Sequence, residues 1–224
     1  MVLIFFFIFL SAIANPSLLL AQAHPGFEKF NLSAKDEAEI LFARGRYEEA
    51  IEKIKTTLNL EGETSYLFRT LLKSWKALNS LKEAEKFIQN YQNSHKESTH
   101  IWYAVGFLNY LKGSYKKAEL DFKKSVQLNP KNGLAWNNLG VIYSKKKEYE
   151  VAVEKVKRAV RANSNEPIFT WNLQKIYAEM GEPDRFKNEY KRLLKKNSKQ
   201  LAWAYGKTLV RVIRQKAFLS YSKG

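Results

Sequence analysis

Apolar and polar positions along this chain follow a helical period, in pairs of stretches separated by short breaks. Residues 98–112 and 116–128 show the pattern, because apolar residues recur there every three or four positions. Such spacing is typical of amphipathic helices that bury one face. The sequence therefore predicts helical hairpins and no β-strand.

The hairpin pattern repeats at one fixed offset. Trp102 and Gly106 are followed 34 residues later by Trp136 and Gly140. Extending this offset in both directions places five repeats without an insertion, at residues 31–64, 65–98, 99–132, 133–166 and 167–200. A period of this length indicates a solenoid, in which stacked hairpins share one continuous core.

Two columns of the repeat carry residues that a hairpin requires. Small residues occupy the helix crossing, at Ala50, Ala84, Ala118 and Ala152, and Phe186 breaks that column. The column between the two helices reads Gly45, Asn79, Gly113, Lys147 and Gly181, most of which tolerate a left-handed backbone. Residues 201–224 follow the last repeat and predict a closing helix. Its apolar stripe reads Leu201, Tyr205, Leu209, Val212, Ile213 and Phe218.

The stretch Trp136 to Tyr143, followed by Ala152, resembles the signature of the tetratricopeptide repeat. Trp102 and Gly106 of the preceding repeat fit the same signature, and the resemblance covers residues 31–200. It implies an all-α fold, an α-α superhelix of five 34-residue hairpins with a C-terminal capping helix. It also implies a concave groove, lined by the first helix of each hairpin, that binds a protein or peptide.

The first 23 residues lie outside the repeats and contain no charged residue. Ala21-Gln22-Ala23 has the small-x-small form of a signal-peptidase site, so the mature chain is expected to begin at His24, with residues 24–30 as a linker. The usual Lys or Arg before the apolar run is absent, which leaves an uncleaved membrane anchor as the alternative. The expectation is export to the periplasm or cell envelope of a bacterium. Terminal sequencing of protein recovered from the envelope would yield His24, whereas intact Met1 in the membrane fraction would establish the anchor.

The net charge of +16 resides in one half of the chain. Residues 112–224 hold 26 Lys or Arg and 10 Asp or Glu, whereas the first half is balanced. A basic half of this kind attracts an anionic surface, either membrane lipid or nucleic acid. Export argues against nucleic acid, because an exported protein does not meet it.

The sequence contains no motif typical of a catalytic, metal-binding or nucleotide-binding site. There is no cysteine, the three histidines have no metal-ligand spacing, and no nucleotide-binding or nucleophile motif occurs. We therefore expect no catalytic residue, no metal, no cofactor and no small-molecule substrate. The expected function is a protein-interaction scaffold at the cell envelope, with binding to an anionic surface as the alternative.

The resemblance implies which positions of each first helix face the groove. They are the position directly after the tryptophan column and the positions four and seven residues beyond it. In the second repeat these positions are basic, and in the third they are aromatic. We expect a basic stripe beside an aromatic one, suited to a peptide that is both acidic and apolar. The expected groove residues at these positions are Arg69, Lys73, Lys76, Tyr103, Phe107, Tyr110, Asn137, Trp171 and Lys175. The resemblance adds Asn138 and Asn172, which occupy the family's groove asparagine column and are expected to hydrogen-bond a ligand backbone.

Overall fold

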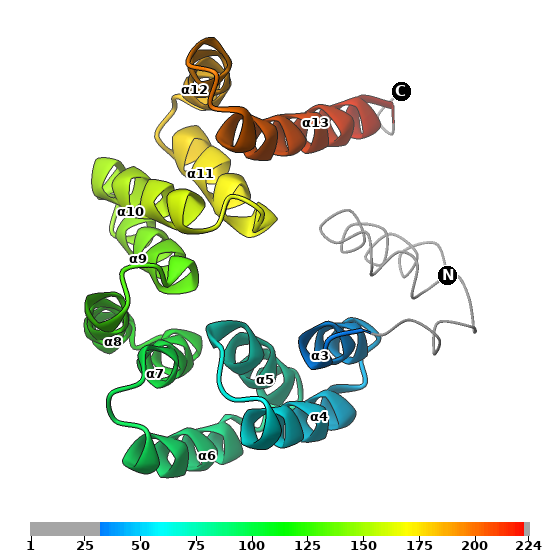
Figure 1. Cartoon of the computed structure of the whole chain (residues 1–224). Helices are drawn as coiled ribbons and strands as arrows, with labels where there is room; N and C mark the ends of the chain where they lie inside the picture. Colours follow the sequence, from blue (N-terminus) through cyan, green and yellow to red (C-terminus); the bar gives the residue numbers. More distant parts are fainter. Residues whose placement is uncertain (1–31, 222–224) are drawn as a thin grey trace. The chain divides into compact units, whose positions relative to one another are not determined.

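The computed structural model describes residues 32–221, with side chains as far as residue 215; the expected signal peptide and linker lie outside this part. The described chain forms eleven α-helices and no strand, which confirms the all-α prediction (Figure 1). The helices are α3 (Ala34–Ala43), α4 (Tyr47–Leu60), α5 (Ser65–Ala77), α6 (Leu81–Ser94), α7 (Thr99–Leu111), α8 (Tyr115–Leu128), α9 (Gly133–Lys145), α10 (Tyr149–Ala162), α11 (Pro167–Glu179), α12 (Pro183–Lys195) and α13 (Lys199–Tyr221).

The turns between paired helices have the left-handed backbone that the sequence column predicts. Gly45, Gly113 and Gly181 have φ of 77°, 80° and 80°. Asn79 and Lys147 adopt the same conformation, with φ of 57° and 64°. Lys147 has a Cβ atom and no side-chain reason to favour this region, so its conformation is imposed by the hairpin around it.

The described helices divide into two compact units, with the boundary between Leu128 and Asn129. In the first unit the first helices α3, α5 and α7 contact one another in sequence order, and α4 and α6 each pack against the first helix that follows. The core of this unit contains Phe68, Leu71, Tyr103 and Phe122, all without exposed surface. The first helices therefore form one continuous layer.

The second unit contains α9 to α13 and is built in the same way. Helix α10 packs between α9 and α11, and α12 packs between α11 and α13. Its core contains Val156, Phe169, Tyr177 and Phe186, none of which is exposed. Phe186 fills the place that alanine holds in the other repeats, and its ring stacks on Tyr205 of α13 with centroids 4.7 Å apart.

Glycine is required where the two helices of a hairpin cross. A Cβ atom built on Gly106 would lie 2.8 Å from Cδ1 of Phe122, and one on Gly140 would overlap Cγ2 of Val156 more closely still. Both approaches are shorter than any real carbon contact. The structure therefore confirms that these two glycines allow the paired helices to pack closely, as the repeat pattern indicates.

One polar network joins the last four helices around a single carboxylate. Glu189 of α12 accepts hydrogen bonds from the hydroxyls of Tyr177 in α11 at 2.9 Å and Tyr205 in α13 at 3.2 Å. It also pairs with Lys157 of α10. Burial, together with the charge of Glu189, raises the pKa of both tyrosines, so they remain donors across the accessible pH range.

The closing helix α13 differs from the expected solvating cap. Tyr205 is buried and Leu201, Leu209 and Val212 are half-buried, as expected for the packed stripe, but Ile213 is 64% exposed. The side chain of Phe218 lies outside the described part. Ile213 turns outward because the packed stripe of α13 is centred on Tyr205 and Thr208, about a third of a turn away.

Among the described helices, none combines the length and the apolar sequence that crossing a membrane requires.

Candidate functional site

The basic positions of the second repeat lie together on α5. Arg69, Lys73 and Lys76 are spaced at i, i+4 and i+7, which places them on one helix face. Lys73 and Lys76 are exposed, and the Arg69 side chain is 22% exposed. We call these three residues the α5 cation row. Ligand binding by these three residues stays a prediction.

Aromatic rings from two neighbouring first helices underlie this row. The Lys73 ammonium lies 4.5 Å from the ring centroid of Phe42 in α3, and the Arg69 guanidinium lies 5.2 Å from that of Tyr66 in α5. Arg69 also approaches Glu39 of α3 at 3.6 Å. Cation–π contact holds the flexible cations in place, which lowers the entropy cost of binding an anionic group there.

The same repeat rule places Phe42 at a groove-facing position of the first repeat, whereas Tyr66 was not predicted as a site residue from the sequence. Tyr66 precedes Arg69 by three residues on one helix, so the i, i+3 spacing was a signal for the second ring. Phe42 belongs to a different repeat, and only the packing of α3 against α5 places it under Lys73.

The aromatic stripe of the third repeat is not the exposed surface expected from the sequence. Tyr103 has no exposed surface and packs on Phe122 of α8 with ring centroids 5.7 Å apart. Phe107 is 8% exposed and stacks between Tyr103 and Tyr110. Tyr110 alone is half-exposed. Of the three rings, only that of Tyr110 is accessible from the surface, and the rings of Tyr103 and Phe107 pack beneath it.

This burial changes the meaning of a substitution at Phe107. Replacing an exposed groove residue by alanine would weaken ligand binding without changing the stability of the fold. Phe107 is instead stacked between two rings and nearly inaccessible, so Phe107→Ala removes core packing as well. Binding is therefore better tested by substituting the exposed lysines of α5 than by substituting Phe107.

The candidate residues of the second unit are largely committed to contacts within the protein. Asn137 is 4% exposed and accepts a hydrogen bond from Nδ2 of Asn172 at 2.8 Å. The Trp171 ring lies under Arg211 of α13, at 4.5 Å from the guanidinium carbon. Lys175 pairs with Glu179 at 3.7 Å.

Asn138 is half-buried on α9. Asn172 is, with Asn138, one of the two asparagines that the family resemblance implies as ligand-binding amides, and its Nδ2 donates to Asn137 within the protein. The stronger candidate face is that of the first unit.

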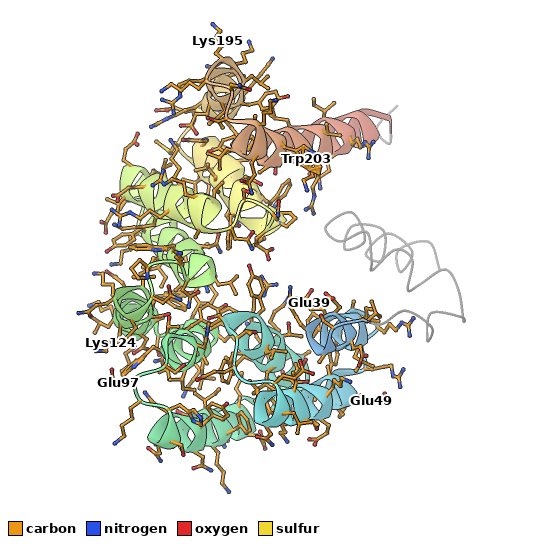
Figure 2. All side chains as sticks on the ribbon, in the orientation of Figure 1. Glu39, Glu49, Glu97, Lys124, Lys195 and Trp203 are labelled. Carbon is orange, nitrogen blue, oxygen red and sulfur yellow. The ribbon has the colours of Figure 1, made fainter. Side chains whose placement is uncertain are left out.

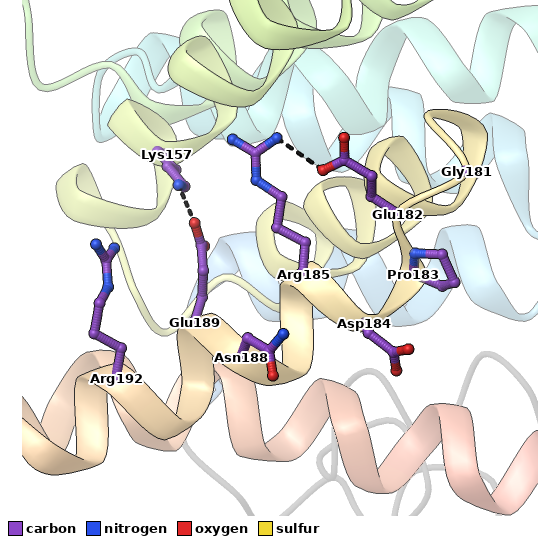
Figure 3. Close-up of a pocket in the computed structure, with 9 residues that line it drawn as sticks. All are labelled: Lys157, Gly181, Glu182, Pro183, Asp184, Arg185, Asn188, Glu189 and Arg192. Carbon is purple, nitrogen blue, oxygen red and sulfur yellow. Dashed lines mark hydrogen bonds and ion pairs between the residues drawn. The ribbon is translucent and has the colours of Figure 1, made fainter.

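A hollow of about 650 Å³ lies beside the turn between α11 and α12, and the sequence did not indicate it (Figure 3). Four of its six charged side chains form pairs: Arg185 contacts Glu182, and Lys157 contacts Glu189. None of the predicted groove residues lines it. Its three basic and three acidic side chains balance in number, so the hollow has no excess charge of either sign with which to attract a charged ligand.

A serine and a histidine meet at the start of α5 in the manner of a nucleophile and its base. Oγ of Ser65 lies 2.9 Å from Nδ1 of His100. The backbone N–H of Ser65 donates to the same nitrogen at 3.1 Å, and Ser65 is only 4% exposed. Burial lowers the pKa of His100, which keeps the ring neutral as an acceptor. The imidazole therefore caps the first turn of α5.

The described helices do not assemble a metal site. No group of three or more His, Asp or Glu side chains within residues 32–221 is placed to hold a metal ion. The side chains that converge in this part of the chain are cations, aromatic rings and hydrogen-bonded amides.

Two sequence models of the tetratricopeptide repeat match this chain, at residues 99–132 and 122–154. No curated protein matches it in sequence. The matched residues comprise the third repeat and most of the fourth, where the signature residues are most complete.

Solved structures share the fold at low sequence identity. A chain of the APC/C hetero-tetramer Cut9–Hcn1 aligns with a TM-score of 0.58 and 17% identity, over 88% of this chain and 41% of that one. This chain therefore spans less than half of that relative's length. TTC0263, a thermophilic TPR protein of Thermus thermophilus, aligns with a TM-score of 0.55 and 18% identity, over 79% and 97% of the two chains. PilF of Pseudomonas aeruginosa aligns with a TM-score of 0.50 and 16% identity, over 84% and 96%.

Proposed function

Because this chain is a tetratricopeptide-repeat protein, we propose that it is a non-catalytic interaction scaffold whose α5 cation row binds an acidic peptide segment. Proteins of this fold typically act as scaffolds, in which stacked first helices present an extended binding surface. The single observation that carries the peptide proposal is the cation row over the rings of Phe42 and Tyr66. Half-exposed Tyr110 on the neighbouring helix α7 supplies an apolar contact.

The chemistry of the face sets the chemistry of the peptide. Two exposed ammonium groups favour carboxylates, and Arg69, which lies beside Glu39 at 3.6 Å, adds positive charge next to them. Tyr110 and the edges of Phe42 and Tyr66 favour an apolar or aromatic side chain beside those carboxylates. The proposed ligand is therefore a peptide segment with Asp or Glu next to large apolar residues.

Binding to this face can be measured with a displayed library of random peptides, followed by titration of synthetic peptides from the selected clones. The double substitution Lys73→Ala/Lys76→Ala is expected to weaken their binding by about 10- to 100-fold, because two charge-assisted contacts are lost. Both side chains are exposed, so the free energy of unfolding should change by less than about 1 kcal/mol.

The matched control is Lys82→Ala/Lys86→Ala on α6, which removes the same charge from two exposed lysines of a second helix. It should leave peptide affinity within about threefold of the parent protein. Equal weakening by the two double variants would show that overall charge, and not the α5 cation row, determines binding. Selection of peptides without acidic residues would also contradict the proposal.

We further propose that the scaffold acts at the bacterial cell envelope. The support is the charge-free segment of residues 1–23 and its Ala21-Gln22-Ala23 ending. The membrane-anchored alternative places the repeats at the same boundary, so both forms would present the α5 cation row to envelope proteins.

A further inference from the structure

Helix α13 has an apolar face that nothing in the described structure covers. It packs against α11 and α12 through Ala202, Tyr205 and Thr208, which are 3–4% exposed. On its other side Trp203, Val210 and Ile213 are 56%, 49% and 64% exposed. Figure 2 shows Trp203 on this helix. Spacings of seven and three residues align these three side chains, which we call the outer face of α13.

The repeat register shows that this exposure is specific to α13. Trp203 and Val210 stand 34 residues after Phe169 and Ile176, which are 0% and 3% exposed on α11. The same two positions are also buried in α5, α7 and α9. They are Leu67 and Ser74 in α5, Ile101 and Leu108 in α7, and Ala135 and Ile142 in α9. Trp203 and Val210 therefore occupy columns that α5, α7, α9 and α11 bury, whereas Ile213 falls in a column that is exposed at Glu179 and Lys145.

Within the described residues, the chain does not turn back after α13 to cover this face. In the five hairpins a residue with positive φ ends the first helix, the last of them Gly181. The corresponding position after a further 34 residues is Gln215, and it remains helical because α13 continues to Tyr221. The outer face is thus available to another molecule.

A helix in the place of the missing hairpin partner is disfavoured by one residue. Lys207 lies in the column that holds Leu71, Val105, Leu139 and Leu173 in α5, α7, α9 and α11; in α3 the same column holds Glu37, which pairs with Lys53 of α4. A helix packed in the usual register would bury the Lys207 ammonium, at a considerable cost in desolvation unless that helix supplied an acidic partner. In the structure Lys207 is exposed, and its nitrogen lies 3.6 Å from the ring centroid of Trp203.

A second copy of the chain is disfavoured by charge. Residues 199–224 contain six Lys or Arg and no Asp or Glu. Lys207 and Arg214 are exposed beside the outer face, so two copies of this face would bring like charges together. The charge complement of this helix is an anionic surface that also accepts apolar side chains.

We propose that the outer face of α13 docks on an anionic membrane surface, with the helix lying in the plane of the interface. Val210 and Ile213 would enter the acyl boundary, and the Trp203 ring would lie at the level of the headgroups, where indole rings concentrate. Lys207 and Arg214 extend to lipid phosphates while their alkyl stems remain beside apolar groups. This docking is separate from peptide binding by the α5 cation row.

The absence of cysteine allows one reporter to be placed at will. Val210→Cys in the full-length protein, labelled with the environment-sensitive dye NBD, is titrated with vesicles of phosphatidylcholine containing about 30% phosphatidylglycerol. We expect a blue shift of the dye and quenching by nitroxide-labelled lipid. The same label at Leu120→Cys, an exposed leucine of α8, should show neither change. Vesicles of phosphatidylcholine alone should produce at most a weak response at position 210.

A second arm tests the face itself. Trp203→Asp/Ile213→Asp, in the chain labelled at position 210, should raise the lipid concentration for half-maximal response at least about tenfold. Leu60→Asp/Leu194→Asp makes the same charge change at two other exposed apolar residues and should raise it less than about threefold. Residues 1–23 are unchanged in every variant, so any lipid binding of their own cancels in the comparison.

The proposal fails if position 210 does not respond to anionic vesicles, or if positions 210 and 120 respond alike. It also fails if the two aspartate pairs weaken the response equally, because general basic charge then explains the attraction. Circular dichroism melting confirms that each variant folds like its parent. A response lost only in Trp203→Asp/Ile213→Asp supports docking through the outer face of α13.

Discussion

Gly140→Ala is expected to lower the free energy of unfolding by about 2–3 kcal/mol, and Gly140→Leu by more. An added Cβ atom would overlap Cγ2 of Val156 and lie 3.0 Å from the backbone oxygen of Ala152. Val156 and Ala152 have no exposed surface, so neither has space to move into. The backbone oxygen cannot rotate away as a side chain does, and the two helices must therefore separate.

Substitutions at two other glycines provide a comparison for Gly140→Ala. At Gly106 the nearest atoms to an added Cβ belong to the Phe122 ring, at 2.8 Å, so Gly106→Ala should cost less than Gly140→Ala. At Gly206 the nearest atom belongs to Tyr190 at 3.4 Å, which is ordinary contact. Gly206→Ala should leave stability unchanged or raise it by up to about 1 kcal/mol through helix propensity.

Urea unfolding monitored by circular dichroism measures the series. Because repeats unfold as coupled neighbours, the midpoint of each variant is compared at a common slope. The expected order of destabilisation is Gly140→Ala, then Gly106→Ala, then Gly206→Ala. Equal effects of the first and last substitution would show that loss of glycine in a helix, and not the close crossing of α9 and α10, is what matters.

Glu189→Ala is expected to lower the free energy of unfolding by about 3–5 kcal/mol. The carboxylate accepts from Tyr177, which has no exposed surface, and from Tyr205, which is 4% exposed. Its removal leaves two buried hydroxyls without this acceptor and Lys157 without its pair. Since these groups come from α10, α11 and α13, the attachment of the last helices to the second unit should weaken.

The control for Glu189 is a nearby carboxylate at the surface. Glu150 accepts two hydrogen bonds from Arg185, at 2.6 and 3.0 Å, but its side chain is 67% exposed. Glu150→Ala should therefore cost less than about 1 kcal/mol. Thermal unfolding of both variants distinguishes the cases, and a cost for Glu189→Ala no greater than that for Glu150→Ala would contradict the network.

The periodic features of this protein are determined by its sequence alone. Helices α5, α7, α9 and α11 begin at residues 65, 99, 133 and 167, with the spacing that the tryptophan and glycine columns show. The left-handed turn residues and the close approaches at Gly106 and Gly140 also follow from those columns. Such features depend on contacts that every hairpin repeats, so a column of one residue type records each of them.

The tertiary structure decides which side chains a partner can reach. Phe107 stands in the same column as exposed Lys73, but its ring is nearly inaccessible and stacks on buried Tyr103. Asn137 is tied to Asn172 of the next repeat. The exposure of the outer face of α13 likewise depends on a covering helix that the described chain does not provide. Each of these outcomes depends on a neighbouring helix tens of residues away, whose position no periodic column records.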